Sequence, residues 1–308
     1  MSGKVRAVMM ALIAGSGLML AGCAATTGKN VQGELLVAPA PNDYKLEITL
    51  AKLSEIIDSA KLTNEQRARF LYERGVIYDR LGLRLMARIQ FHEALKIMPN
   101  LADAYNFMGI YLTQEGDYEA AFEAFDSVLE LMPDYDYAYL NRGIAQYYAG
   151  INQLAVKDLE SFYFADKQDG YRVLWLYIAQ HQVNAEQAKA QLLLNRAQLS
   201  DDEWSTAIVD YVAGKYTDAE LLALAKKELK HPREYLERLC EAYFYMAKVA
   251  EYQQLNDNAV QYLRLALATN IYDFVEYRYA RVELARLVKP VSQGAAQGPE
   301  QEPEQEQE

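Results

Sequence analysis

The stretch GDYEAAFEAF, residues 116–125, joins a turn signal to alanines and phenylalanines at helical spacing. Comparing the chain with itself at an offset of 34 residues shows that this pattern recurs. The offset aligns four sets of residues: Gly75, Gly109 and Gly143; Ala87, Ala121 and Ala155; Phe91, Phe125 and Leu159; Pro99 and Pro133. Small residues allow two helices to cross closely and proline ends a helix, so the pattern predicts a stack of similar helix pairs.

A 34-residue period with these residue types resembles the tetratricopeptide (TPR) repeat. Three units are expected at 68–101, 102–135 and 136–169, and a late unit at 240–273 has Ala247 in the glycine position. Two diverged helix pairs fit between them at 170–233, with Ser200 to Glu203 and Thr217 to Glu220 as capping boxes. A last helix at 274–288 would cap the open end. The predicted fold is an all-α, TPR-type helical-repeat solenoid.

An N-terminal helix is predicted at 43–62, where one apolar seam contains Leu46, Leu50, Leu53 and Ile57. The seam could pack on the first repeat of its own chain. Alternatively, it could pack on a second chain and form a symmetric homodimer. The residues alone leave both arrangements open.

The N-terminus has the features of a secretory signal peptide at 1–22 followed by a lipidation site. A short apolar run, broken by Gly15 and Gly17, ends at Leu20-Ala21-Gly22-Cys23, so a membrane span is disfavoured and Cys23 is the expected acyl acceptor. Ala24 matches the pattern of outer-membrane lipoproteins, which places the body in the periplasm. A flexible tether is expected at 23–42 and a disordered acidic tail at 289–308.

Charge and composition argue against nucleic-acid binding and against catalysis. Removal of the signal peptide leaves 29 basic and 43 acidic residues, a net charge of −14, which repels phosphate backbones. The chain has three histidines and none of the common metal-binding, nucleophile or phosphate-loop motifs, so no metal, cofactor or catalytic residue is expected. Cys240 lies in an apolar helical stretch and is interpreted as a small buried residue.

Repeats of this kind offer a groove lined by the first helix of each unit. Position in the repeat selects eleven candidates for binding a peptide or partner helix: Tyr72, Val76, Asp79, Asp103, Asn106, Ile110, Tyr137, Leu140, Asn141, Ile144 and Tyr147. One TPR class uses paired lysine and arginine to hold a terminal carboxylate. Tyr137 and Asn141 occupy those positions in the third unit, so a ligand recognised chiefly through its terminal carboxylate is not expected.

The strings LAGC, LYERGVIYDRLGLR, GIYLTQEGDYEAAFEAFDSVLEL, LNRGIA and FVEYRYA resemble the NlpI family of outer-membrane lipoproteins over roughly residues 20–288. This resemblance implies a homodimeric, non-enzymatic adaptor that binds the periplasmic tail-specific protease Prc. It also implies delivery of murein endopeptidases to that protease and contacts with other peptidoglycan enzymes. The alternatives are a subunit of an outer-membrane barrel, pilus or secretin assembly machine, and a murein hydrolase.

Light scattering distinguishes the two arrangements of the N-terminal helix. If the seam is exchanged between chains, deleting residues 43–60 from the soluble body is expected to convert a dimer into a monomer, because the exchanged contact is lost. An unchanged mass would contradict the exchanged arrangement.

Overall fold

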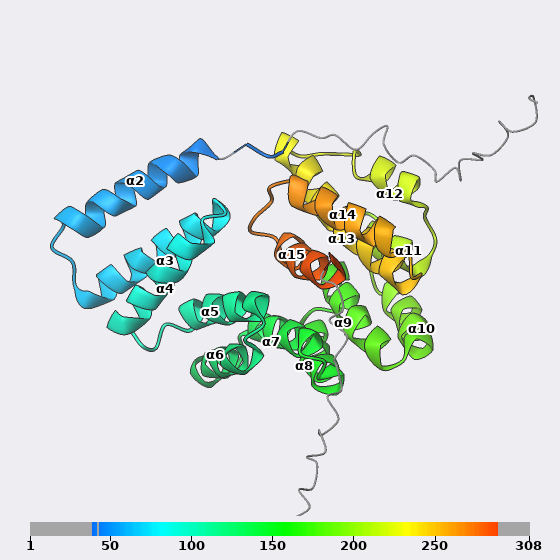
Figure 1. Ribbon diagram of the computed structural model, residues 1–308, viewed down its shortest axis with the longest axis horizontal. Helices are drawn as coiled ribbons and strands as arrows, with labels where there is room; N and C mark the ends of the chain where they lie inside the picture. The colour runs from blue at the N-terminus through cyan, green and yellow to red at the C-terminus, as the bar shows by residue number, and fades with distance from the viewer. Residues whose placement is uncertain (1–38, 42, 289–308) are drawn as a thin grey trace, which may run out of the picture. The chain divides into compact units, whose positions relative to one another are not determined.

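In a computed structural model of the chain we describe residues 39–41 and 43–288. This part of the chain contains helices and no strand, which confirms the predicted all-α fold (Figure 1). None of these helices combines the length and apolarity needed to span a bilayer. The helices are α2 Tyr44–Ser59, α3 Asn64–Arg80, α4 Arg84–Ile97, α5 Ala102–Glu115, α6 Tyr118–Leu131, α7 Asp136–Tyr148, α8 Asn152–Ala165, α9 Gly170–Val183, α10 Ala185–Arg196, α11 Trp204–Ala213, α12 Asp218–Leu224, α13 Pro232–Tyr252, α14 Asn256–Ala268 and α15 Val275–Val288.

The three expected repeats correspond to the helix pairs α3–α4, α5–α6 and α7–α8, and the two helices of each pair pack against each other. The turn within the middle pair begins at Gly116, whose φ of 83° is readily adopted by glycine. Asp117 then caps α6 by accepting a hydrogen bond from the backbone N–H of Ala120 at 3.4 Å. The dipeptide Gly116-Asp117 therefore ends α5 and starts α6.

Close helix crossing explains the repeated glycines. A Cβ atom added to Gly109 would lie 2.6 Å from the ring of Phe125, and one added to Gly75 would lie 2.7 Å from Phe91. Both rings are fully buried. The first helix of each unit therefore approaches the second to a distance that only glycine allows, as the sequence period predicted.

Later helices follow the expected order with shifted boundaries. The pairs α9–α10 and α11–α12 occupy the diverged stretch, and α13 begins at Pro232, eight residues before the expected start of the late unit. The Thr217–Glu220 capping box is present. The Ser200–Glu203 box is wrong, because α11 begins only at Trp204 and Ser200 instead accepts a bond from the backbone of Asp202.

The segment just before α2 departs from the expected tether. Ala40 is buried, and its backbone N–H donates to the carbonyl of Thr269 at the end of α14 at 3.0 Å. A small residue between Pro39 and Pro41 fits against that helix end. The tether predicted to reach residue 42 is therefore docked at 39–41. The signal peptide, Cys23 and the tail at 289–308 lie outside the described residues.

Gly109→Ala tests the close crossing. Alanine favours a helix over glycine by about 1 kcal/mol, but overpacking against Phe125 costs about 1–3 kcal/mol, so we expect a net loss of up to about 2 kcal/mol in the free energy of unfolding measured with urea.

The double variant Gly109→Ala with Phe125→Leu serves as the control, because the smaller side chain makes room for the new methyl group. We expect it to lose less stability than the sum of the two single losses. Additive losses would contradict a direct clash at this crossing.

Candidate functional site

The eleven groove candidates lie on α3, α5 and α7, and the structure divides them by exposure. Five remain at least partly accessible: Tyr72, Val76, Asp103, Tyr137 and Tyr147. Six are buried between helices, with side chains that neighbouring helices cover: Asp79, Asn106, Ile110, Leu140, Asn141 and Ile144. Much of the expected groove surface is therefore packed inside the protein.

Buried polar groove candidates are paired within the chain. The side-chain amide of Asn141 donates to that of Asn106 at 2.9 Å and links α7 to α5. The hydroxyl of Tyr111 donates to Asp79 at 2.6 Å and links α5 to α3. These groups satisfy one another, so their hydrogen-bonding capacity serves the stacking of repeats.

Helix α15 lies against the first helices of the repeats. In Figure 1 it sits between α13 and α14 on one side and α5, α7 and α9 on the other, and packing with α5, α13 and α14 agrees with this placement. Arg278 of α15 forms an ion pair with Asp79 of α3. Tyr279 stacks on Tyr148 of α7 at 5.2 Å and meets Trp175 of α9 edge-on at 5.8 Å. The helix expected only to cap an open end also occupies the inner side of the stack.

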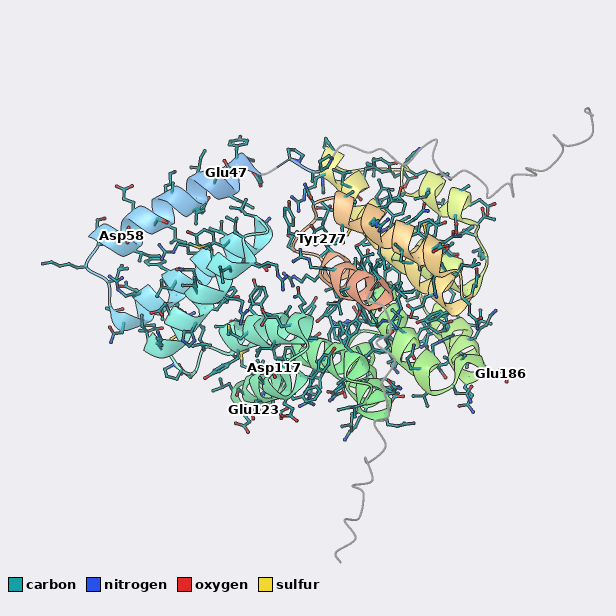
Figure 2. The ribbon with its side chains drawn as sticks, viewed as in Figure 1. Glu47, Asp58, Asp117, Glu123, Glu186 and Tyr277 are labelled. Carbon is teal, nitrogen blue, oxygen red and sulfur yellow. The ribbon has the colours of Figure 1, made fainter. Side chains whose placement is uncertain are left out.

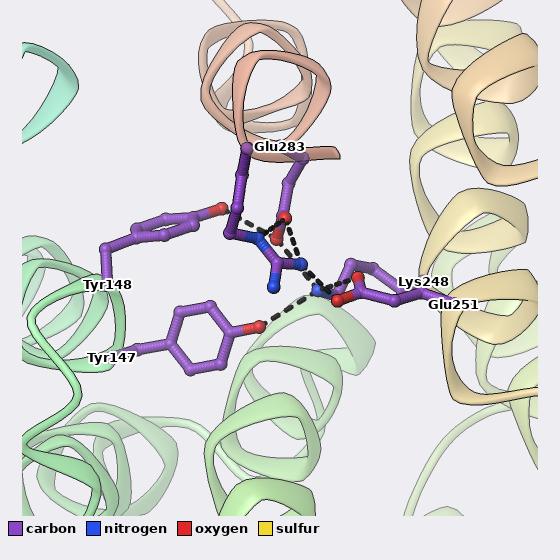
Figure 3. Close-up of polar contacts among 6 residues, drawn as sticks. Tyr147, Tyr148, Lys248, Glu251 and Glu283 are labelled. Atoms are coloured by element: carbon purple, nitrogen blue, oxygen red, sulfur yellow. Dashed lines mark hydrogen bonds and ion pairs between the residues drawn. The ribbon is translucent and has the colours of Figure 1, made fainter. Parts of the chain in front are cut away.

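A buried ionic cluster holds α15 to α7 and α13 (Figure 3). The ammonium of Lys248 lies 2.8 Å from carboxylate oxygens of both Glu283 and Glu251 and donates to the hydroxyl of Tyr147 at 2.9 Å. Arg286 completes the cluster by donating to Glu283. Burial alone would lower the pKa of Lys248, but Glu283, Tyr147, Tyr252 and Glu251 together more than offset this and raise it well above its ordinary value.

The accessible part of the repeats lies at the N-terminal ends of α3 and α5. An open pocket of about 600 Å³ is lined there by Glu65, Arg69 and Asp103, and by residues at the ends of α4 and α6. The latter include Ile97, Met98, Leu131 and Met132. Leu131 and Met132 are 42% and 46% exposed. The pocket therefore combines exposed apolar side chains with charged groups at its edge.

Tyr137 is an exposed side chain at the N-terminal end of α7, the first helix of the third unit. Its side chain is 53% exposed and packs against Phe162 with ring centroids 5.7 Å apart. Rigid, partly exposed tyrosine is common in protein-binding surfaces because it adds contact area at low entropic cost. We call the pocket together with Tyr137 the docking surface.

The N-terminal seam packs on the first repeat of the described chain. Leu53 and Ile57 are buried in one cluster with Phe91, and Leu46 and Leu50 pack against that cluster. On its other side α2 exposes Tyr44, Ile48 and Ile56, while Glu47 and Asp58 mark its two ends (Figure 2). Exchange of the helix between two chains stays a prediction.

The described residues include one cysteine, Cys240. Cys240 is fully buried, as the sequence predicted, and burial raises the pKa of its thiol well above the ordinary value. No group of three or more His, Cys, Asp or Glu side chains within 39–41 and 43–288 could hold a metal ion.

Two buried carboxyl groups were not anticipated from the sequence. Glu241 accepts hydrogen bonds from the hydroxyl of Tyr171 at 2.8 Å and the indole of Trp204 at 2.7 Å, and Glu276 accepts one from Tyr245. Burial, followed by the charge of Glu276, raises the pKa of Glu241 to about 8. The sequence feature that could have indicated the buried Glu241 is its place, as a charged residue, inside the apolar run LCEAYFYMAKVA, which also contains Lys248.

This raised pKa predicts a loss of stability as pH rises. Between the unfolded pKa of 4.5 and the folded value near 8, the folded state binds more protons than the unfolded state. The contribution of protonated Glu241 to the free energy of unfolding is therefore complete below pH 4.5 and is lost progressively toward pH 8. At about 1.4 kcal/mol per pKa unit, the loss amounts to a few kcal/mol.

Urea unfolding at several pH values between 5 and 8 measures this loss. Glu241→Gln, which mimics the neutral acid, is expected to show a flatter profile than the unaltered chain. Parallel profiles would contradict the assignment to Glu241.

Comparison with known proteins agrees with the repeat assignment. Residues 102–135 match the tetratricopeptide repeat family, and this is the second of the three expected units. Among solved structures, the chain is similar to a tetratricopeptide repeat protein from Parabacteroides merdae, with 16% identity, a TM-score of 0.46, and coverage of 80% of this chain and 99% of that one. It is also similar to pilF of Pseudomonas aeruginosa, with 18% identity, a TM-score of 0.41, and coverage of 72% and 100%. Residues 102–135 are therefore a tetratricopeptide repeat within the all-α part of the chain that the structure describes.

Proposed function

We propose that this protein is a non-enzymatic adaptor that binds other proteins through the docking surface. Tetratricopeptide repeats mediate protein–protein interactions. The observation that carries the proposal is the pocket of about 600 Å³, which the partly exposed side chains of Leu131 and Met132 line. Apolar side chains beside polar groups favour an anchoring contact with a partner side chain. Helix α15 packs against the inner side of the repeats, whereas the pocket at this end of the helices is open.

A more specific assignment rests on the resemblance to the NlpI family. The proposed partners are a periplasmic tail-specific protease and the murein endopeptidases that it degrades, together with other peptidoglycan enzymes. In this role the adaptor would limit peptidoglycan cleavage during envelope growth and cell division. Cys23 would carry the acyl chains that hold the protein at the periplasmic face of the outer membrane, and the protein would work as a homodimer.

A pull-down from solubilised cell envelopes tests the partner and the surface together. We expect the unaltered chain to recover a tail-specific protease. Met132→Glu is expected to lose it, because a charge in the pocket opposes an apolar anchor. Leu255→Glu is the matched control, since Leu255 is 48% exposed, close to the 46% of Met132, and lies on the late repeat.

Three outcomes would contradict the proposal. Recovery of barrel, pilus or secretin assembly subunits in place of a protease would favour the assembly-machine alternative. Equal recovery of the protease by the Met132→Glu chain would show that the protease does not bind at the docking surface. Cleavage of purified sacculi by the isolated protein would show that it is an enzyme.

A Cys23→Ser chain is expected to leave the membrane fraction, and its retention there would contradict lipid anchoring.

A further inference from the structure

A small cavity lies where the first repeat meets the start of α15. Its walls include Arg84 from α4, Gln114 and Tyr111 from α5, and Arg278 and Arg281 from α15. Tyr277, near the start of α15, lines the same cavity and is labelled in Figure 2. The sequence separates these residues widely, so only the placement of α15 against the repeats brings them together.

Positive charge exceeds negative charge at this cavity. Three guanidinium groups line it with one carboxylate, that of Asp79. Asp79 is already engaged, since it pairs with Arg278 and accepts the hydroxyl of Tyr111 at 2.6 Å. Neither Arg84 nor Arg281 has a carboxylate within salt-bridge distance in the described part of the chain. A chain whose net charge is −12 thus concentrates unneutralised positive charge at one point.

The electrostatic environment of Arg84 agrees with a missing counter-charge. Burial lowers the pKa of Arg84 and the positive charge of Arg281 lowers it further, while Tyr111, Glu115 and Asp79 offset only part of this. Two guanidinium groups close enough to repel each other would both be stabilised by one anion between them. Arg281 is exposed, which leaves the approach to this position open to solvent.

Hydrogen-bonding groups at the cavity also lack partners. The Nε atoms of Arg84 and Arg278 and the Oε1 atom of Gln114 are buried, and none has a hydrogen-bond partner among the described residues. Buried polar atoms are nearly always paired with protein, water or a ligand. Two unpaired N–H donors beside excess positive charge indicate an acceptor that is itself negatively charged.

The size of the cavity limits the ligand. Its free volume of about 10 Å³ holds one water-sized group, and a carboxylate oxygen has this size. A phosphate group would need room for several buried oxygens.

We propose that this cavity is a carboxylate-binding site in which Arg84 and Arg281 hold the anion at the junction of the first repeat and α15. The carboxylate can come from the acidic segment 289–308 of the same chain, which contains five glutamates, or from an acidic side chain or terminus of another protein. The groove positions Tyr137 and Asn141, where the basic pair of a carboxylate clamp is missing, do not line this cavity. The site does not depend on the proposed adaptor function.

Calorimetric titration of the full chain with a peptide tests the site. The probe is EPEQEQE with a free C-terminus, at about 0.15 M salt, where exposed charges are screened beyond about 8 Å. The primary sample carries glutamine at Glu300, Glu302, Glu304, Glu306 and Glu308, so that its own tail competes little. We expect saturable binding that sodium acetate displaces.

Variants assign this binding to the cavity. Arg84→Gln combined with Arg281→Gln is expected to weaken binding at least about tenfold, because charge-assisted hydrogen bonds are lost. Arg264→Gln on α14 is the matched control, since Arg264 is an exposed arginine, and it should leave the affinity within about twofold. Absence of saturable binding, or an equal loss with Arg264→Gln, would overturn the proposal.

A single variant and a comparison of the two tails complete the titration. If the double variant does not fold, Arg281→Gln alone carries the test, because an exposed side chain can be replaced without disturbing packing; an unchanged affinity would then overturn the site. Binding several-fold weaker to the chain with its native tail than to the glutamine-tailed chain supports the site and identifies the tail as its occupant. Equal binding to both supports the site with a carboxylate from another protein.

Discussion

The close approach of paired helices is the constraint on which the rest of the structure depends. Each of the first two repeats places a fully buried phenylalanine ring directly over a glycine of the preceding helix, at a distance that leaves no room for a methyl group. This contact sets the spacing within a pair, and the 34-residue period repeats it along the chain. The resulting stack brings the ends of the first helices, with Asp79, Tyr147 and Tyr148, to one side, where α15 packs.

Packing of α15 depends on charged groups as much as on apolar ones. Lys248 and Glu283 are almost completely buried, and desolvating both is costly unless each is paired. The structure pairs both of them, with Glu251, Arg286 and Tyr147 as additional partners. A buried ionic cluster of this kind contributes little net stability compared with an apolar one, but it penalises any other position of α15. The cluster thereby fixes the position of α15 against α7 and α13.

The sequence predicted the repeats well because the period records local packing. Gly109, Ala121 and Phe125 meet within one unit, so their spacing along the chain is visible by comparing the chain with itself. Contacts of α15 were not predictable in this way. Arg278 meets Asp79 and Glu283 meets Tyr148 across many intervening residues, and no spacing rule connects them. Six groove candidates were placed correctly on first helices but are buried, because helix position alone does not reveal that neighbouring helices cover them. The Ser200 box failed because its sequence pattern fits a turn as well as a helix start.

Hydrogen exchange of α15 in the full chain tests most directly whether the inner side of the repeats is filled. Amide protection reports the free energy of local opening, so a helix held by Lys248, Asp79 and Trp175 should open only with the surrounding core. We expect peptides from 275–288 to exchange as slowly as those from the buried helix α9. Exchange as fast as that of an unpacked terminal helix would contradict the account, because the inner side of the repeats would then be open to a partner.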